Sequence, residues 1–215
     1  MESFIDFVIS RWDDVVESTI EHVIYVVSVI FTATIIALAT GIFVRTRPVY
    51  REVILGVYSV FLTIPSLALF VLFIPILGLG FWPPYVALTM YALLPIARNT
   101  VTGLAGVDPA IVESARGMGL SNRQRLWKIE MPLAWPVIVT GIRVSTLLVT
   151  GIAAIATLVA GGGLGDFIKS GLARIGAPNA MEAIWTGTVF VVLLALILDA
   201  IFIGIRRLST SEGLR

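Results

Sequence analysis

Residues 113–132 read ESARGMGLSNRQRLWKIEMP, a polar and basic stretch with long apolar segments on both sides. Pro109 and Ala110, just before it, are expected to open a short helix, because proline suits the first turn of a helix. Gly117 and Gly119 then permit the backbone to turn. The stretch therefore predicts a helix followed by a glycine turn within an otherwise membrane-like sequence.

A second short helix is expected after this turn, with Ser121 or Asn122 as its N-cap and Ile129 near its end. Two helices joined by a turn can seat in a groove on another protein. The alternative is an ordinary amphipathic loop at a membrane surface, because four basic or aromatic side chains suit lipid headgroups equally well: Arg123, Arg125, Trp127 and Lys128.

The composition predicts an integral membrane protein. Of the 215 residues, 58% are hydrophobic and 13% charged, and the mean hydropathy of +0.98 lies outside the range of soluble globular domains. A net charge of +1 gives no indication of nucleic-acid binding, and the lack of cysteine excludes disulfides and cysteine-ligated metals. The single histidine, His22, leaves little scope for a metal cluster.

Five apolar runs are long enough to cross a bilayer, which takes about 20 residues. They cover residues 23–44, 53–77, 84–105, 133–160 and 183–205. Most basic residues lie in three connecting or terminal segments: 45–51, 98–128 and 206–215. The positive-inside rule then predicts an external N-terminus and a cytoplasmic location for residues 107–132 and the C-terminus.

The expected organisation has three parts. Residues 1–22 carry several acidic side chains, which opposes a cleavable signal peptide and favours an external amphipathic helix at the membrane surface. Residues 23–205 form the transmembrane domain, and residues 206–215 form a cytoplasmic tail.

Prolines inside the runs are expected to kink the helices, either to line a cavity or to suit packing: Pro65, Pro75, Pro95 and Pro136.

The basic stretch resembles the "EAA" loop of permease subunits in binding-protein-dependent ABC importers. Glu113-Ser114-Ala115, then Gly119, Ile129 and Met131-Pro132 follow the family spacing, although Ser114 replaces an alanine and Met131 a leucine. Further segments resemble the branch that serves osmoprotectants such as glycine betaine, choline, carnitine and proline: 63–80 (TIPSLALFVLFIPILGLG), 93–104 (LLPIARNTVTGL), 113–120 (ESARGMGL) and 160–168 (AGGGLGDFI). The sequence also resembles importers of methionine and other amino acids, which are the alternative to the osmoprotectant branch.

The resemblance implies an all-α permease with the methionine-importer-like (type I) fold in a prokaryotic inner membrane. It implies two cytoplasmic ATPase subunits that bind ATP and Mg, a second permease copy or a sister subunit, and an external substrate-binding protein. No cofactor is expected on this chain. The coupling loop, residues 107–132, would dock the ATPase through eight residues: Glu113, Ser114, Ala115, Gly117, Gly119, Leu120, Ile129 and Pro132.

A glycine run follows the fourth apolar segment, at Gly161, Gly162, Gly163 and Gly165. No Lys-Ser or Lys-Thr follows it, so it does not match a phosphate-binding loop. Its expected external position suits a gate or a contact with the binding protein, and the alternative is a tight loop with no other role.

Three charged residues, Arg98, Arg143 and Asp199, lie inside the predicted spans. A lone charge at the bilayer centre costs at least about 2.5–3.5 kcal/mol, so a partner or water is expected. Asp199 is expected to pair with one of the arginines, and the depth along the helices slightly favours Arg98 over Arg143. A structural ion pair is the main interpretation, and a role along the transport path is the alternative.

The transport path has five candidate residues: Thr63, Pro65, Ser66, Asn99 and Thr100. Six aromatic rings are candidates for contact with a quaternary ammonium substrate, and the alternative is that they are interfacial anchors: Trp82, Tyr85, Trp185, Phe61, Tyr58 and Tyr91. The rival function from a different class is an ATPase-independent channel or secondary transporter. Inverted repeats or a polar ion-binding cluster would favour that rival, and neither is visible in the sequence.

Overall fold

The computed structural model describes residues 4–209, and this part of the chain is helical with no strand. In chain order its elements are α1 (Phe4–Ser10), α2 (Trp12–Val44), α3 (Pro48–Thr63), α4 (Ser66–Leu77), α5 (Trp82–Ala105), α6 (Pro109–Gly117), α7 (Asn122–Arg125), the π-helical turn η1 (Leu126–Glu130), α8 (Met131–Ala153), the 3-10 turn η2 (Ala156–Val159), α9 (Gly165–Leu172) and α10 (Ala180–Ser209).

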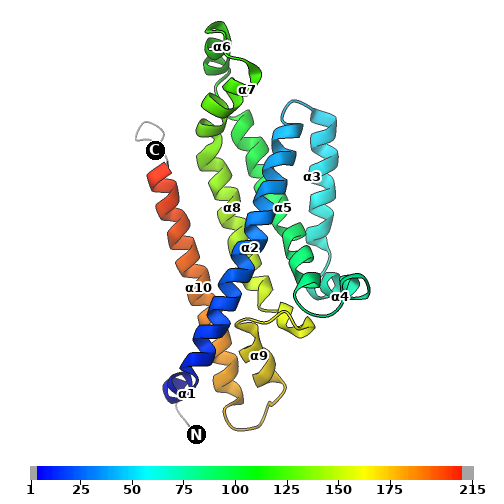
Figure 1. Ribbon diagram of the computed structural model, residues 1–215, viewed down its shortest axis with the longest axis vertical. Helices are drawn as coiled ribbons and strands as arrows, with labels where there is room; N and C mark the ends of the chain where they lie inside the picture. The colour runs from blue at the N-terminus through cyan, green and yellow to red at the C-terminus, as the bar shows by residue number, and fades with distance from the viewer. Residues whose placement is uncertain (1–3, 210–215) are drawn as a thin grey trace.

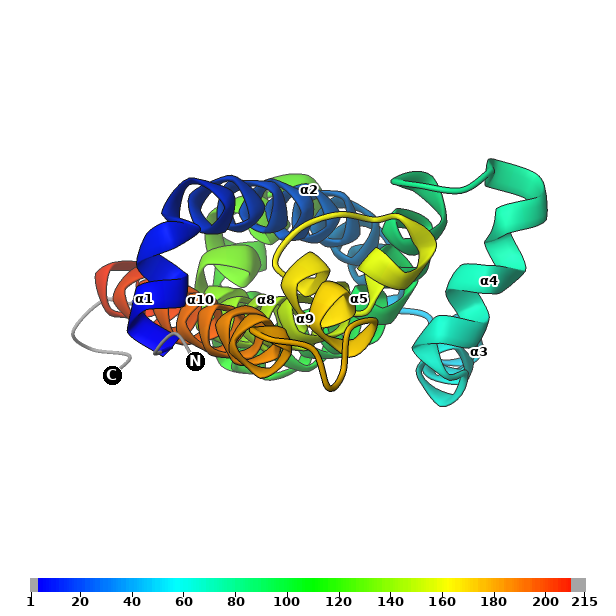
Figure 2. The same cartoon turned by 90° about the horizontal axis from the view of Figure 1, so that it is seen from below.

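The long helices α2, α5, α8 and α10 run along the long axis of the molecule (Figure 1). α6 and α7 project at one end, which we call the coupling end, and α1 and α9 lie at the opposite end (Figure 1). Figure 2 shows α1 crossing between α2 and α10, with α3 and α4 standing to one side of the bundle. The coupling loop and the glycine run therefore lie at opposite ends of the molecule.

α5 is the central helix, and 15 of its 24 residues are buried. It packs most extensively against α8 and α2. Small residues allow this close approach: Gly141 of α8 faces Asn99, and a Cβ added at Gly141 would lie 2.6 Å from the Asn99 Cβ. Across the bundle, the buried His22 of α2 lies 3.1 Å from the Thr150 carbonyl oxygen of α8.

The five spans predicted by the sequence are not confirmed by the lengths and compositions of the helices. Within residues 4–209, three helices are long and apolar enough to cross a membrane: Trp12–Val44, the continuous helix Asn122–Ala153, and Ala180–Arg207. α5 is not among them, because Pro83, Pro84, Arg98 and Asn99 lower its hydropathy. Its neighbours in the protein, rather than lipid, cover most of its surface.

The apolar run at residues 53–77 is not one straight span. It forms α3 and α4, which meet at an angle of 100° and count as a fourth span only when taken together. The break follows from Pro65, because proline disfavours the helical conformation in the preceding residue; Ile64 is extended, with φ −79° and ψ 131°. The proline kink expected here is confirmed as a full break, whereas Pro75, Pro95 and Pro136 lie inside continuous helices.

Two helices in the structure also extend beyond the bounds of the predicted apolar runs. The fourth run, predicted at residues 133–160, belongs to a helix that already begins at Asn122 and ends at Ala153. The residues beyond it include η2, where Ala156, Thr157 and Val159 are buried in the protein and Leu158 is exposed. At the other end of the chain, α2 runs unbroken from Trp12 to Val44, so residues 12–22 belong to the same helix as the first predicted span.

Candidate functional site

The first half of the coupling loop is a capped helix. Asp108 is the N-cap of α6, and its Oδ1 accepts a hydrogen bond of 2.8 Å from the Ala110 backbone N–H. Pro109 occupies the first turn, as the sequence predicted. The helix ends at Gly117, and Ser114 donates its hydroxyl to the Ala110 carbonyl at 2.8 Å. Local sequence rules are sufficient to define this helix.

The turn between α6 and α7 depends on one glycine. Gly119 has φ +81°, a conformation that other residues rarely adopt, and nothing lies within 4 Å of where its Cβ would be. Ser121 then caps α7 in a capping box: its Oγ accepts from the Gln124 N–H at 3.3 Å, and the Gln124 Oε1 accepts from the Ser121 N–H at 2.9 Å. The predicted glycine turn and the Ser121 cap are both confirmed.

The second helix of the coupling loop does not stop at Ile129. It continues through η1, where the Met131 N–H bonds to the Leu126 carbonyl five residues earlier, and runs without a break into α8. Pro132 therefore lies inside this continuous helix and does not begin a separate span. The extra residue of a π-turn is common at functional sites.

The tip of the coupling loop exposes both polar and apolar side chains. Glu113, Ser114, Gly117 and Gly119 are exposed, Leu120 and Ile129 are half-buried, and Ala115 is buried. Large apolar side chains are exposed beside them, with Met118 at 71% and Trp127 at 57% exposure. Such a mixed surface at the end of the molecule is suited to contact with another protein.

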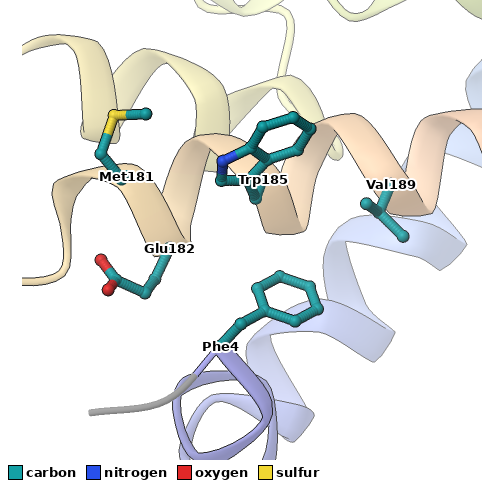
Figure 3. A pocket seen from close by; sticks show the side chains of 5 residues that line it. All are labelled: Phe4, Met181, Glu182, Trp185 and Val189. Atoms are coloured by element: carbon teal, nitrogen blue, oxygen red, sulfur yellow. The ribbon is translucent and has the colours of Figure 1, made fainter. Parts of the chain in front are cut away.

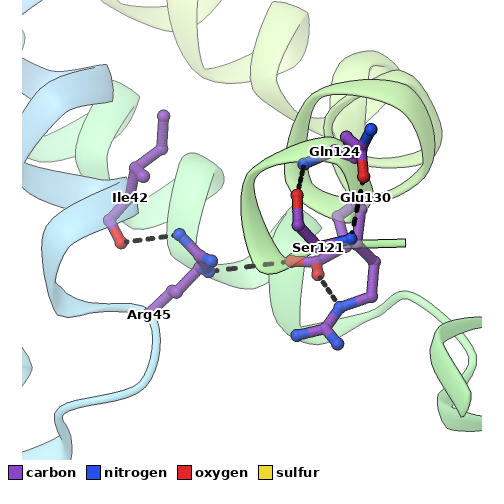
Figure 4. Close-up of polar contacts among 6 residues, drawn as sticks. Ile42, Arg45, Ser121, Gln124 and Glu130 are labelled. Atoms are coloured by element: carbon purple, nitrogen blue, oxygen red, sulfur yellow. Dashed lines mark hydrogen bonds and ion pairs between the residues drawn. The ribbon is translucent and has the colours of Figure 1, made fainter. Parts of the chain in front are cut away.

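The base of the coupling loop carries an ion network that sequence reasoning missed (Figure 4). Glu130 is 7% exposed, and its Oε1 accepts a hydrogen bond of 2.9 Å from the Arg125 Nε. Its Oε2 lies 3.6 Å from the Nε of Arg45, at the end of α2, and Arg45 also reaches the Ile42 carbonyl. The network links the coupling loop to α2 across a long sequence separation, so no local pattern revealed it.

A small cavity of about 220 Å³ lies beside this network. Its lining comes from the turn after α2, the end of α5, α6, α7 and η1: Arg45, Thr46, Leu104, Ala105, Val112, Arg125 and Glu130. The coupling loop is thus supported by charged contacts at its base and is incompletely packed beside them.

An ion pair joins α8 to α10, two helices that are each part of a segment long and apolar enough to cross a membrane. Arg143 donates two hydrogen bonds to Asp199, from Nε to Oδ1 at 2.6 Å and from Nη2 to Oδ2 at 2.8 Å. The expectation that Asp199 has an arginine partner is confirmed, but the slight preference for Arg98 was wrong. Arg98 is exposed on α5 and makes no ion pair or hydrogen bond with the residues that the structure describes. Depth along a helix does not determine which way a side chain points.

The five path candidates do not gather at one place. Thr63, Pro65 and Ser66 lie at the break between α3 and α4, where they are exposed or half-buried. Thr100 is fully buried against Gly41 of α2 and donates to the Ile96 carbonyl. Asn99 packs against α8 and donates to the Pro95 carbonyl. The last two residues therefore support the α5 contacts with α2 and α8.

The aromatic candidates also divide into groups. Tyr85 and Trp82 cluster with Phe81 at the start of α5, and the Tyr85 hydroxyl lies 2.7 Å from the Thr32 hydroxyl. Among the deeper rings, Tyr58 donates to Thr40 and Tyr91 to the Ile64 carbonyl, while Phe61 packs against the core. Trp185 is exposed on α10, away from these rings.

The glycine run is tied to the beginning of α2. The Gly163 N–H donates to the Glu21 Oε2 at 3.1 Å, and Gly162 and Gly163 have φ of +74° and +86°. A Cβ on Gly165 would clash with the Ala154 carbonyl oxygen. The run is therefore a tight connection between α8 and α9 whose geometry requires glycine.

Comparisons with known proteins agree with this architecture. Residues 20–207 match the family described as binding-protein-dependent transport system inner membrane component. The chain is 35% identical over all 215 residues to the choline transport system permease protein of Bacillus subtilis strain 168, and covers 97% of that protein. It is 38% identical to the carnitine transport permease protein of Listeria monocytogenes, over 93% of this chain and 89% of that protein.

A solved structure gives the same fold. An inward-facing structure of the MetNI methionine ABC transporter has a TM-score of 0.80 and 27% sequence identity, covering 92% of this chain and 96% of the matched chain. The methionine-importer-like fold and the importer class predicted from the coupling loop are thereby confirmed. The chain belongs to the family of binding-protein-dependent transport system inner membrane components.

Proposed function

We propose that this chain is half of an ATP-driven import path for a compatible solute: choline, carnitine, glycine betaine or proline. The observation that carries the proposal is similarity along nearly the full chain to permeases named for choline and for carnitine. The methionine transporter shares the fold at a lower identity, so methionine or another amino acid is the less favoured substrate.

A second permease, either another copy or a sister subunit, completes the path. The outward face of α3 supports this. Tyr58 marks its inward face, because it is buried and donates a hydrogen bond to Thr40 of α2. Helical periodicity then places three polar or small residues on the opposite, outward face: Glu52, Gly56 and Thr63. Polar side chains in a span face protein or water rather than lipid.

Two ATPase subunits dock at the coupling loops of the two permeases and bind the ATP and Mg, while this chain catalyses no reaction. Glu113 is exposed at the tip and would bond to the ATPase, and Gly119 provides the turn between the two helices. The coupling end and the C-terminus are cytoplasmic in this proposal. The N-terminus and the glycine run are external, where Gly161–Gly165 would lie close to the substrate-binding protein.

ATP binding closes the ATPase pair and displaces the coupling loop, and the spans then rock from inward-open to outward-open. η1 joins the coupling loop to α8 without a break, and Glu130 links the same segment to Arg45 of α2. A displacement of the loop would therefore move both helices together.

The first experiment is co-purification in detergent with the ATPase produced in the same cells. The tagged wild-type chain should retain the ATPase, and Glu113→Ala combined with Gly119→Val should release it. Gly151→Ala is a suitable control, because no atom lies within 4 Å of the Cβ position and it is far from the coupling loop. A homo-oligomer that transports without any ATPase would overturn the proposal in favour of a channel or secondary transporter.

Uptake into proteoliposomes that contain the whole complex and its binding protein identifies the solute. Labelled choline, carnitine, glycine betaine, proline and methionine should be compared at equal concentration. We expect ATP-dependent uptake of one or more of the first four. Uptake of methionine alone would contradict the proposed substrate class. The methionine transporter that shares the fold would then be the better guide to the substrate than the permeases of similar sequence.

A further inference from the structure

A cleft lies between α1 and the beginning of α10, at the end opposite the coupling loop (Figure 3). Its volume is about 410 Å³, within the range of small-molecule sites, which is roughly 300–1,000 Å³. Five residues line it: Phe4, Met181, Glu182, Trp185 and Val189. The four residues on α10 follow the spacing of a single helix face. One side of the cleft is therefore a rigid helix surface.

The other side is held in place by packing. Phe7 of α1 is 5% exposed and belongs to a small core with Val15, Phe167 and Ala183. This core joins α1 to α2, α9 and α10. The cleft therefore has defined walls on both sides, although α1 is only one short helix.

The cleft combines aromatic rings with an uncompensated carboxylate. Phe4 projects from α1 toward α10, and Trp185 lies one turn beyond Glu182 (Figure 3). Trp185 is 55% and Phe4 38% exposed, so both rings are accessible. The Glu182 carboxylate makes no ion pair or hydrogen bond with residues 4–207, and none of the residues lining the cleft is basic.

We propose that this cleft binds a methylated ammonium cation. Ring faces attract such a cation through their quadrupole, Trp most strongly, and the methyl groups bury apolar surface against Met181 and Val189. Glu182 supplies the opposite charge. Because the cleft has no basic residue for a ligand carboxylate, it favours the cation choline over the zwitterions glycine betaine and carnitine.

The site is separate from the coupling loop and does not depend on the proposed transport. A choline headgroup of a lipid carries the same trimethylammonium group as free choline, so the shared chemistry is a methylated ammonium group from either source. Binding measurements need no ATPase. A negative result here therefore leaves the import proposal standing, and failure of import leaves this site untouched.

The test is saturation-transfer difference NMR on the purified full chain in detergent, which detects weak binding through the ligand methyl protons. Choline should bind with an affinity on the order of millimolar. Its neutral isostere, in which carbon replaces the nitrogen, should bind more weakly by about threefold to tenfold, because it keeps the shape and loses the charge. Equal binding of both compounds would overturn the proposal.

Variants assign the binding to the cleft. Trp185→Leu and Glu182→Gln should each weaken choline binding by about threefold to tenfold, and Trp185→Phe should retain part of it. Trp127→Leu is the matched control, because Trp127 is 57% exposed but lies in the coupling loop. A loss of binding in the control, or none in the two cleft variants, would contradict the assignment.

Nanodiscs distinguish the two sources of the cation. In discs of phosphatidylglycerol, free choline should bind as it does in detergent. In discs of phosphatidylcholine, competition by the headgroup should reduce binding of free choline, which would support a site shared by lipid and solute. The proposal would be overturned if choline bound neither in detergent nor in phosphatidylglycerol discs and the lipid headgroup did not compete. Trp185 would then be a membrane anchor.

Discussion

Arg143 of α8 and Asp199 of α10 form a two-point ion pair, with N–O distances of 2.6 and 2.8 Å. The pair matters because the most apolar window of α10 is largely uncovered, with only 6% of its residues buried. A planar guanidinium that meets both carboxylate oxygens fixes orientation as well as distance. The pair thus sets the position of α10 against α8.

Asp199→Asn should lower the melting temperature of the detergent-purified chain, because Arg143 then loses a charged partner within a predicted span. The double variant Arg143→Gln with Asp199→Asn should recover part of the loss, since neither charge remains alone. Fluorescence-detected thermal unfolding measures both effects. A single variant that melts like the wild type would show that the pair does not stabilise the chain.

Glu130→Gln should destabilise the coupling end by about 1.5–3 kcal/mol, the range for hydrogen bonds to charged groups. The change keeps the size of the side chain but leaves Arg45 and Arg125 facing a neutral amide. Protease cleavage within the coupling loop should become faster, which gives a local measurement beside global unfolding. Arg123→Gln, an exposed change in the same helix, should leave the cleavage rate unaltered.

Gly141→Ala should cost about 1–3 kcal/mol, typical of overpacking. The added methyl group would lie 2.6 Å from the Asn99 Cβ and 2.8 Å from the Pro95 carbonyl oxygen, so α5 and α8 must move apart. Gly151→Ala in the same helix meets no atom within 4 Å and should change stability by less than about 0.5 kcal/mol. Equal melting temperatures for the two variants would contradict the close contact.

Gly119→Val should destabilise the turn of the coupling loop by about 1–2 kcal/mol, because valine is strained at φ +81°. Gly117→Ala, two residues earlier, adds a methyl group with no neighbour within 4 Å and should be neutral or slightly stabilising. Hydrogen exchange across the coupling loop measures the difference. In the full complex, the valine variant should also uncouple ATP hydrolysis from uptake.

The coupling loop was predictable from sequence because its structure follows local rules. Ser121 can cap the residues that follow it, and Gly119 stands where the turn requires a positive φ. The same reasoning missed Glu130, whose partner Arg45 lies far away in the chain. Contacts of that kind depend on how helices pack, which no local pattern contains.

The span assignments were less accurate for a related reason. Hydropathy identifies apolar segments but not what covers them. It counted residues 53–77 as a single span although Pro65 breaks them into two helices at 100°. It also extended the fourth span over η2, where Ala156 and Val159 are buried in protein. The sequence predicted that Asp199 has an arginine partner but not which arginine, because the direction in which Arg98 and Arg143 point follows from helix packing.

The π-turn at Leu126–Glu130 also has a consequence for how the chain tolerates changes in length. A π-turn holds one residue more than an α-helix needs for the same path, and one residue corresponds to about 100° of rotation. Removing a residue within η1 should restore a regular α-helix and leave the coupling loop and α8 in the same mutual orientation. A deletion elsewhere between Asn122 and Ala153 would turn one against the other. The helix thus contains one short segment in which a residue can be lost without changing the direction in which the coupling loop points.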